Sequence, residues 1–300
     1  MKARQHNPTI AFLIGTLGIA LFSGMDAVMK GLVLSIGTFA TMFWRNLIGL
    51  VMSGSVYGVR RLAWPKREVL KIHVMRGVLS AGMGFLFFWG LARVPIAQAV
   101  ALAFVSPLVA LYLASLLLHE QVGRRTVLGS VIAFAGILII FAGQARAELG
   151  HEALLGSLAI IASATLYAMN IILMRQQSLL AEPVEIAFFQ SLTVSAVLLL
   201  VLPIAGVEVP QGPHWPWLTF AAALAFASML LLSWAYARAE ASYLATTEYT
   251  AFLWAALFGW LVFGEPLELL TVSGAVLIVA GCILAARRPE EASPALEAAG

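Results

Sequence analysis

Ten apolar blocks of about 20 residues follow one another along this chain. A helix rises 1.5 Å per residue, so roughly 20 residues cross the ~30 Å hydrocarbon core of a bilayer. The predicted spans are 9–29, 36–57, 72–92, 97–118, 125–143, 152–174, 183–204, 216–236, 242–263 and 267–286. Strands of a membrane barrel would alternate in polarity over shorter segments, and successive segments here do not. The sequence therefore predicts an all-α integral membrane protein with ten transmembrane helices.

The composition leaves too little polar material for a water-soluble surface. Hydrophobic residues make up 61% of the chain and charged residues 11%, whereas soluble domains carry roughly 45 to 50% and about 25%. The first block is too long for a secretory signal and has no evident small-x-small cleavage site, so we interpret it as the first span. The single cysteine, Cys282, excludes an internal disulfide framework.

The lysine and arginine residues indicate how the spans are oriented. With the N-terminus in the cytoplasm, 13 of the 18 basic residues fall on the cytoplasmic side. Three fall on the other side, namely Lys30, Arg93 and Arg146, and Arg45 and Arg76 lie within spans. This bias predicts a multi-pass protein of the bacterial cytoplasmic (inner) membrane with both termini cytoplasmic. The net charge of +3 is then a topology signal and not a nucleic-acid footprint.

The chain contains an internal repeat. A shift of 145 residues aligns 89–136 with 234–281 without a gap, and 13 of these 48 pairs are identical, against roughly five expected by chance in so apolar a composition. We predict a first repeat over 1–148, a second repeat over 149–288 and a disordered cytoplasmic tail over 289–300.

Each repeat holds five spans, an odd number, so the second repeat enters the membrane from the opposite side. Inverted repeats allow one fold two related conformations, each open to a different side of the membrane. They therefore predict a carrier that works by alternating access. The alternative is a duplicated packing unit without a role in transport.

The repeated motifs resemble a known family. The segment Trp89–Arg93, the His119-Glu120 step and the glycines Gly129 and Gly136 are each echoed in the second half. This pattern resembles the EamA family of the drug/metabolite transporter superfamily, and within it the YddG-type amino-acid exporters. The resemblance implies a fold in which spans one to four and six to nine surround a central cavity, while spans five and ten lie outside it.

The resemblance also implies which residues line the cavity and what it carries. Positions Met83, Ser106, Pro107 and Tyr167 would face the cavity, and amino acids would be the substrates. Relatives that export aromatic amino acids carry more aromatic residues at these positions, so Met83 and Ser106 argue against a specificity for aromatic amino acids alone.

Ionisable residues inside spans are costly and normally face a protein interior or a wet cavity. Glu248 lies in the ninth span, where the other repeat has Ala103, and we predict that it holds a substrate ammonium group or a coupling proton. A structural hydrogen bond is the alternative. Arg45 is predicted to meet a substrate carboxylate through parallel hydrogen bonds, or to form a structural salt bridge. Asp26 is a third candidate, and its alternative is a local i, i+4 ion pair with Lys30.

Uncharged residues complete the candidate site. Pro107 removes a backbone hydrogen bond in the middle of the fourth span, which predicts a kink at the cavity or a static bend. Tyr167 and Asn170 offer hydrogen bonds to a substrate or to a neighbouring helix. The residues predicted to bind substrate are Asp26, Arg45, Met83, Ser106, Pro107, Tyr167, Asn170 and Glu248.

A second set of residues lies at the ends of the spans and is predicted to form gates. Arg93 and Glu265 fall in outer connections, whereas Arg238 and Glu120 fall in inner ones, so an Arg–Glu pair could latch each gate in turn. The alternative is that the carboxylates cap the fifth and tenth helices. The predicted gate residues are Trp89, Arg93, Glu120, Trp234, Arg238 and Glu265.

Other functions find little support in the sequence. The His119-Glu120 and His151-Glu152 steps lack the second histidine that a zinc protease needs, and no nucleophile elbow or phosphate-binding loop occurs. We expect no catalytic residue, metal or cofactor. A channel would usually show a filter or charged ring, which is not visible. The predicted function is export of amino acids or similar small metabolites, with multidrug, sugar or nucleoside efflux as the alternative. The expected partners are a small-molecule substrate and the lipid bilayer, and a monomer is compatible with the sequence.

Overall fold

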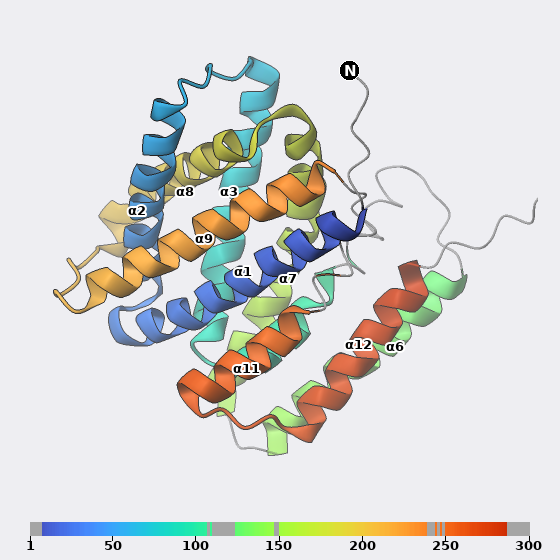
Figure 1. The fold of residues 1–300 in the computed structure, drawn as a ribbon. Coiled ribbons are helices and arrows are strands. Elements are labelled where there is room, and N and C mark those ends of the chain that lie inside the picture. Colours follow the sequence, from blue (N-terminus) through green and yellow to red (C-terminus); the bar gives the residue numbers. More distant parts are fainter. Residues whose placement is uncertain are drawn as a thin grey trace, which may run out of the picture.

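The computed structural model describes residues 8–106, 109, 124–146, 150–238, 244, 247 and 250–286. Within these residues the chain forms ten α-helices and no strand (Figure 1). The helices are α1 (Pro8–Ile36), α2 (Thr38–Val59), α3 (Arg67–Leu91), α4 (Ile96–Ala103), α6 (Arg124–Arg146), α7 (Gly150–Leu180), α8 (Pro183–Ala205), α9 (His214–Tyr236), α11 (Ala251–Phe263) and α12 (Leu269–Ala286). The predicted all-helical class is confirmed, and each predicted span overlaps one of these helices.

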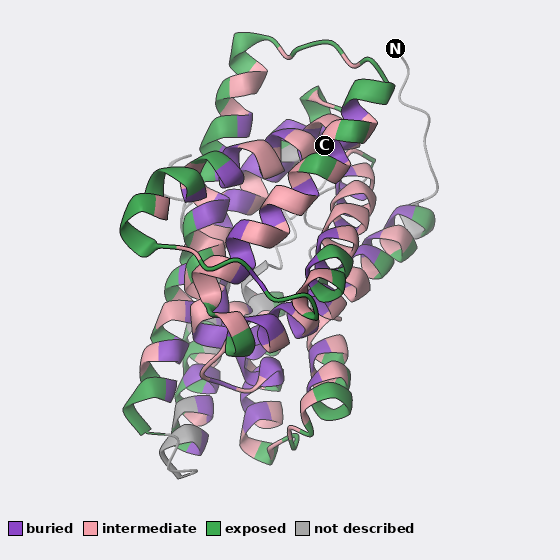
Figure 2. Cartoon of the chain, turned by 90° about the vertical axis from the view of Figure 1, so that its left-hand side faces the viewer, coloured by how far each residue is buried: buried purple, intermediate pink, exposed green. Residues whose placement is uncertain are grey.

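Five of the described helices are long and apolar enough to cross a membrane, namely α1, α3, α7, α8 and α9. Large apolar side chains also stay exposed on the outside of the bundle, as at Val51, Leu200 and Ile204. Figure 2 shows buried positions gathered toward the middle of the bundle and exposed positions at its ends. The exposed apolar side chains on the outside of the bundle are stable when the surrounding solvent is hydrocarbon.

Helix α1 extends further than the sequence predicted. The predicted first span ended at residue 29, and the charge count placed Lys30 outside the membrane. In the structure the helix continues to Ile36. Lys30 is accommodated within the protein, because its side chain is only 5% exposed and donates a hydrogen bond to the Val94 carbonyl. The chain then reverses at Gly37, whose φ of 78° is open to glycine at little cost, and α2 begins at the next residue. The same extension occurs in α7, where the predicted span ended at 174 and the helix ends at Leu180.

Each main helix–helix contact joins one repeat to the other. Helix α1 packs on α9, α3 on α7, α2 on α8, α4 on α11 and α6 on α12. A shift of about 145 residues turns α1 into α7 and α3 into α9, so the α1–α9 contact has its symmetric counterpart in α3–α7. The arrangement agrees with the predicted pair of inverted five-helix repeats.

Helices α6 and α12 lie side by side at one edge of the bundle (Figure 1). Glycines allow this close approach, because a Cβ atom on Gly136 would come within 2.5 Å of the backbone oxygen of Gly274. The reverse contact, from Gly274 to the Gly136 oxygen, would be 2.7 Å. These two glycines therefore serve close helix packing.

Candidate substrate cavity

A cavity of about 160 Å³ lies between α1, α2, α3, α7, α8 and α9. A second hollow of about 140 Å³ adjoins it, and the two share Phe22, Met83, Phe88 and Tyr167 among their lining residues. We call them the arginine lobe, which contains Arg45, and the aspartate lobe, which contains Asp26. Both repeats contribute helices to the lining, as the resemblance implied for spans around a central cavity.

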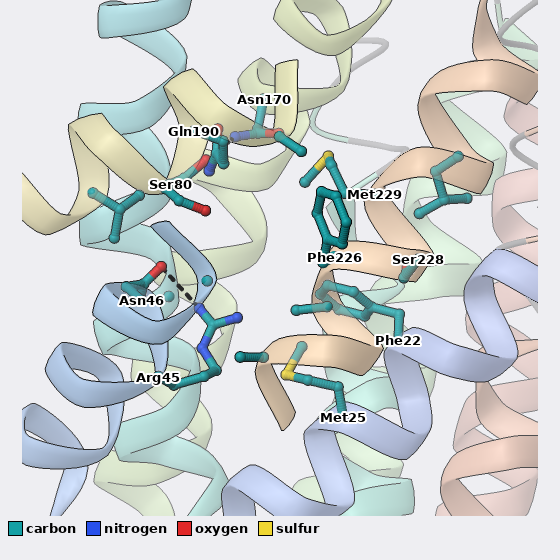
Figure 3. Close-up of a pocket in the computed structure, with 18 of the residues that line it drawn as sticks. Phe22, Met25, Arg45, Asn46, Ser80, Asn170, Gln190, Phe226, Ser228 and Met229 are labelled. Carbon is teal, nitrogen blue, oxygen red and sulfur yellow. Dashed lines mark hydrogen bonds between the residues drawn. The ribbon is translucent and has the colours of Figure 1, made fainter. Parts of the chain in front are cut away.

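The arginine lobe has one polar wall and one apolar wall (Figure 3). Helices α2, α3, α7 and α8 supply the polar wall, and its side chains are Arg45, Asn46, Ser80, Asn170 and Gln190. Helices α1 and α9 supply the apolar wall, on which Phe22, Met25, Phe226 and Met229 lie. Such a cavity suits a molecule with a charged head and a hydrocarbon part.

Arg45 points into the arginine lobe with unused hydrogen-bond donors. Its Nη2 donates to Asn46 Oδ1 at 3.1 Å, while its buried Nε has no partner. Asn46 is itself fixed by a hydrogen bond from Nδ2 to the Met42 carbonyl at 2.8 Å. Gln190, the symmetric counterpart of Arg45 in the second repeat, lines the same lobe and leaves its buried Oε1 unpartnered. A buried polar atom without a partner costs roughly 1 to 3 kcal/mol, and both atoms can still form a hydrogen bond.

Asp26 lines the aspartate lobe and is 4% exposed, with its Oδ1 unpartnered. The alternative of a local Asp26–Lys30 ion pair is wrong, because Lys30 Nζ donates instead to the Val94 carbonyl at 2.8 Å and to Glu265. Asp26 interacts electrostatically with Arg45. Among the described residues, however, no ion pair joins the two side chains.

Arg76 is a second guanidinium of the arginine lobe and is 2% exposed. Its Nε donates to Asn170 Oδ1 at 3.3 Å and its Nη1 to Gln177 Oε1 at 2.7 Å. Among the described residues, the acceptors of Nη2 are thioether sulfurs, Met174 Sδ at 3.4 Å and Met229 Sδ at 3.7 Å. Every described hydrogen-bond partner of this cation is therefore neutral.

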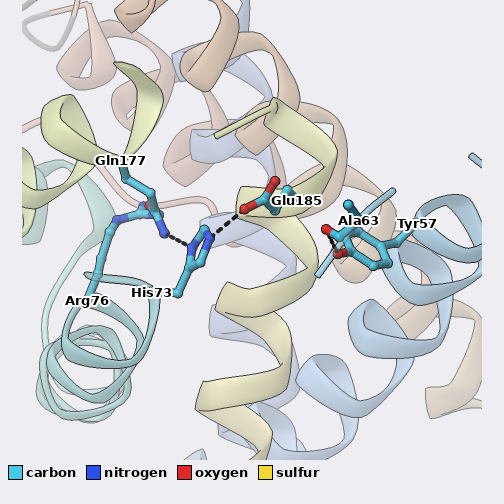
Figure 4. Close-up of polar contacts among 6 residues, drawn as sticks. All are labelled: Tyr57, Ala63, His73, Arg76, Gln177 and Glu185. Carbon is cyan, nitrogen blue, oxygen red and sulfur yellow. Dashed lines mark hydrogen bonds and ion pairs between the residues drawn. The ribbon is translucent and has the colours of Figure 1, made fainter. Parts of the chain in front are cut away.

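A chain of hydrogen bonds leads from Arg76 to the end of the bundle (Figure 4). Gln177 contacts Arg76 through its oxygen and His73 Nδ1 through its amide nitrogen, and His73 Nε2 lies 3.0 Å from Glu185 Oε1. The His73 ring also stacks on Phe189, with 4.7 Å between ring centroids. Sequence reasoning missed His73, Gln177 and Glu185, although a search for every polar residue within a span would have included His73 and Glu185.

Asn170 has both roles that the sequence left open. It lines the cavity, and it joins α3 to α7 by donating from Nδ2 to Ser80 Oγ at 2.6 Å. Met83 and Tyr167 line both lobes, and Ser106 lines the aspartate lobe. Six of the eight predicted substrate-binding residues thus come together at one cavity, while Pro107 and Glu248 lie outside the described residues. That these residues bind substrate stays a prediction.

The gate residues have different partners from those predicted. Glu265 Oε2 accepts the backbone N–H of Ile96 at 2.8 Å and Oε1 pairs with Lys30, so this carboxylate caps α4 and not α12. We call Lys30, Glu265 and Ile96 the latch cluster. Arg93 Nε donates to Glu152 Oε2 at 2.8 Å, so the predicted Arg93–Glu265 contact is not formed. The difference arises because α1 is longer than predicted. Lys30 lies on the extra part of this helix, where its Nζ contacts Glu265 Oε1.

The repeated Trp–Arg motif forms the same local structure in both halves. The Arg93 guanidinium lies 3.5 Å from the ring centroid of Trp89 and donates to its carbonyl, and Arg238 lies 4.0 Å from that of Trp234 with the same backbone bond. These cation–π contacts tie each arginine to its own helix end. The remaining gate residue, Glu120, lies outside the described residues.

Two inverted helical repeats around a cavity lined with charged and polar groups define a multi-pass membrane transporter. Residues 9–142 and 154–287 each match the model of the EamA-like transporter family, so the chain belongs to this family. The finer resemblance to YddG-type exporters stays a prediction. A solved crystal structure covers 92% of this chain and 97% of its own, with a TM-score of 0.61 at 20% identity, which supports the fold alone.

Relatives with assigned substrates carry small molecules. The pseudopaline exporter CntI of Pseudomonas aeruginosa (strain UCBPP-PA14) is 27% identical over 278 residues, which cover 92% of this chain and 95% of that protein. The riboflavin transporter of Brucella anthropi is 27% identical over 254 residues, covering 82% and 87%. The S-adenosylmethionine uptake transporter of Rickettsia bellii is 26% identical over 276 residues, covering 88% of each chain.

Proposed function

We propose that this protein is a secondary carrier of the bacterial inner membrane that exports amino acids or similar small metabolites by alternating access. The relatives support a small-molecule cargo, since they are described as transporters of pseudopaline, riboflavin and S-adenosylmethionine. The exporter CntI, which covers more of this chain than the other two, supports the outward direction.

One observation carries the proposal of a zwitterionic cargo. Asp26 and Arg45 place opposite charges on the two adjoining lobes, and each keeps a buried atom without a partner. Charged groups at membrane depth are costly, and they persist where they serve a substrate path. A molecule with an ammonium group and a carboxylate would satisfy both groups at once.

The latch cluster supports alternating access. Lys30 belongs to the first repeat, Glu265 to the second, and their contact also holds the start of α4, so the cluster closes one end of the bundle across the repeats. The positive-inside bias places this end outside. In the proposed cycle, the Lys30–Glu265 contact is the closed form of the outer gate.

The repeat supplies a second pair for the opposite gate. The 145-residue shift that aligns the repeats carries Lys30 to Arg175 and relates Glu265 to Glu120, so charge is kept at both positions. Both partners belong to the predicted inner side. In the proposed cycle the Lys30–Glu265 pair closes the outer gate, and an Arg175–Glu120 pair closes the inner gate in the alternate conformation. At the outer gate this pairing replaces the predicted Arg93–Glu265 contact, whereas the predicted Arg238–Glu120 contact stays a prediction because Glu120 lies outside the described residues.

Counterflow in proteoliposomes tests the proposal. Purified protein is reconstituted with an internal load of unlabelled amino acid, and entry of labelled amino acids is measured with and without a pH gradient. We expect saturable exchange that an excess of unlabelled substrate abolishes, as a carrier requires and an open channel does not. Exchange of a drug or sugar by protein that exchanges no amino acid would refute the amino-acid assignment.

A further inference from the structure

The cavity holds more positive than negative charge among its described residues. Arg45 and Arg76 line the arginine lobe, whereas Asp26 is the one described carboxylate of the two lobes. Arg45 and Asp26 partly offset each other through their electrostatic interaction. No described acidic residue forms an ion pair with Arg76, whose guanidinium is buried. Within the described part of the chain, Arg76 is therefore a buried cation at the cavity without a carboxylate partner.

Arg76 has donors that a carboxylate would use better than its present partners do. In the described part of the chain, its Nη2 has the sulfur atoms of Met174 and Met229 as its acceptors, and thioether sulfur is a weak acceptor. Both methionines line the cavity. A carboxylate that displaced these flexible side chains would make charge-assisted hydrogen bonds, which are about twice as strong as neutral ones.

We propose that the substrate is an amino acid with a second acidic group, held with its ammonium group at Asp26 and its two acidic groups at Arg45 and Arg76. This inference rests on the proposed function and narrows it. The apolar wall that faces Arg45 in Figure 3, with Phe22 and Phe226, would contact the hydrocarbon chain between the two acidic groups.

The arrangement of the two lobes supports three separate contacts. Asp26 and Arg45 interact electrostatically but form no direct ion pair among the described residues, so each can contact one charge of an amino acid head group. Asn46 and Asn170 orient the two guanidiniums by accepting hydrogen bonds from Arg45 Nη2 and Arg76 Nε, respectively. The guanidiniums are thereby fixed before the substrate enters, which lowers the entropic cost of binding.

Competition in the counterflow assay tests the inference. Proteoliposomes exchanging labelled glutamate receive glutamate, 2-aminoadipate, glutamine, phenylalanine or glutarate as the unlabelled competitor. Glutamine keeps the shape of glutamate without its second charge, and glutarate keeps both acids without the amino group. We expect glutamate and 2-aminoadipate to compete at least about tenfold more strongly than the other three, because a site built around buried polar groups rejects ligands that leave them unpaired.

Three variants assign the contacts. Arg76→Gln should abolish the preference for glutamate over glutamine, Arg76→Lys should retain part of it, and Asp26→Asn should abolish the preference for glutamate over glutarate. Arg60→Gln, an exposed residue at the end of α2, is the matched control and should keep the wild-type pattern. If Arg76→Gln does not fold, the wild-type competition series and the Arg76→Lys variant still test whether Arg76 binds the second acidic group.

The outcomes separate this inference from the proposed function. If the wild-type protein exchanges glutamine or phenylalanine as well as glutamate, the proposal that the substrate carries a second acidic group is wrong. The proposal of an amino-acid carrier is then unaffected. Unchanged glutamate preference in a folded Arg76→Gln variant would also overturn the proposed second acidic group. Protein that exchanges no amino acid at all would remove both proposals.

Discussion

The latch cluster gives a stability prediction that follows from burial. Lys30 and Glu265 have side chains that are 6% and 17% exposed, so removing the carboxylate leaves a buried ammonium group. Breaking one partner of a buried pair costs about 3 to 5 kcal/mol, because the remaining charge is no longer compensated. For a chain of this size roughly 2 °C of thermal midpoint corresponds to 1 kcal/mol, so Glu265→Gln should unfold about 6 to 10 °C below wild type.

The assay is thermal unfolding of the purified protein in detergent, with two comparison variants. Lys30→Met combined with Glu265→Gln removes both charges and should recover most of the loss, since a buried pair replaced by uncharged groups is often close to neutral. Glu152→Gln removes the partner of Arg93 in a pair whose carboxylate is 68% exposed, and should cost at most about 1 kcal/mol.

Two results would refute this reasoning. If Glu265→Gln and Glu152→Gln lower the midpoint equally, burial of the Lys30–Glu265 pair does not matter. If the double variant is less stable than Glu265→Gln alone, the cost does not come from an uncompensated Lys30.

Two further predictions concern the helix pair at the edge and the second gate. Gly136→Ala should lower the thermal midpoint by the equivalent of about 1 to 3 kcal/mol, because its Cβ would meet the Gly274 oxygen at 2.5 Å. The control Gly58→Ala, whose Cβ would have no atom within 4 Å, should leave the midpoint unchanged. Equal midpoints for the two variants would contradict the close contact. Glu120→Gln and Arg175→Gln should slow counterflow by similar factors, and their combination should be no slower than either alone, whereas independent, multiplying effects would show that the two residues do not act as a pair.

The sequence predicted the fold well because its strongest signals are local. Span length and the 145-residue repeat can be found without knowing which segments are in contact, and each predicted span overlaps a described helix. Asp26, Arg45 and Asn170 were found for a similar reason, since polar groups at membrane depth must face the interior.

What the sequence did not predict depends on contacts between distant segments. The alternative considered for Asp26 was an ion pair with Lys30 four residues away, but Lys30 pairs with Glu265, which is 235 residues away. The hydrogen bonds from Arg76 to Asn170 and Gln177 likewise span 94 and 101 residues. No periodicity within one helix specifies which of several polar groups on other helices will be nearest.

The glycine contact between α6 and α12 bears on how the molecule can move. Backbones this close resist sliding, because any shift along the helix axes would drive a carbonyl oxygen into a neighbouring chain. This pair belongs to different repeats and lies at the edge of the bundle, away from the cavity. If the two repeats rock against each other, the α6–α12 pair would therefore act as the hinge and move little. The largest displacements would fall on the helices farthest from this pair.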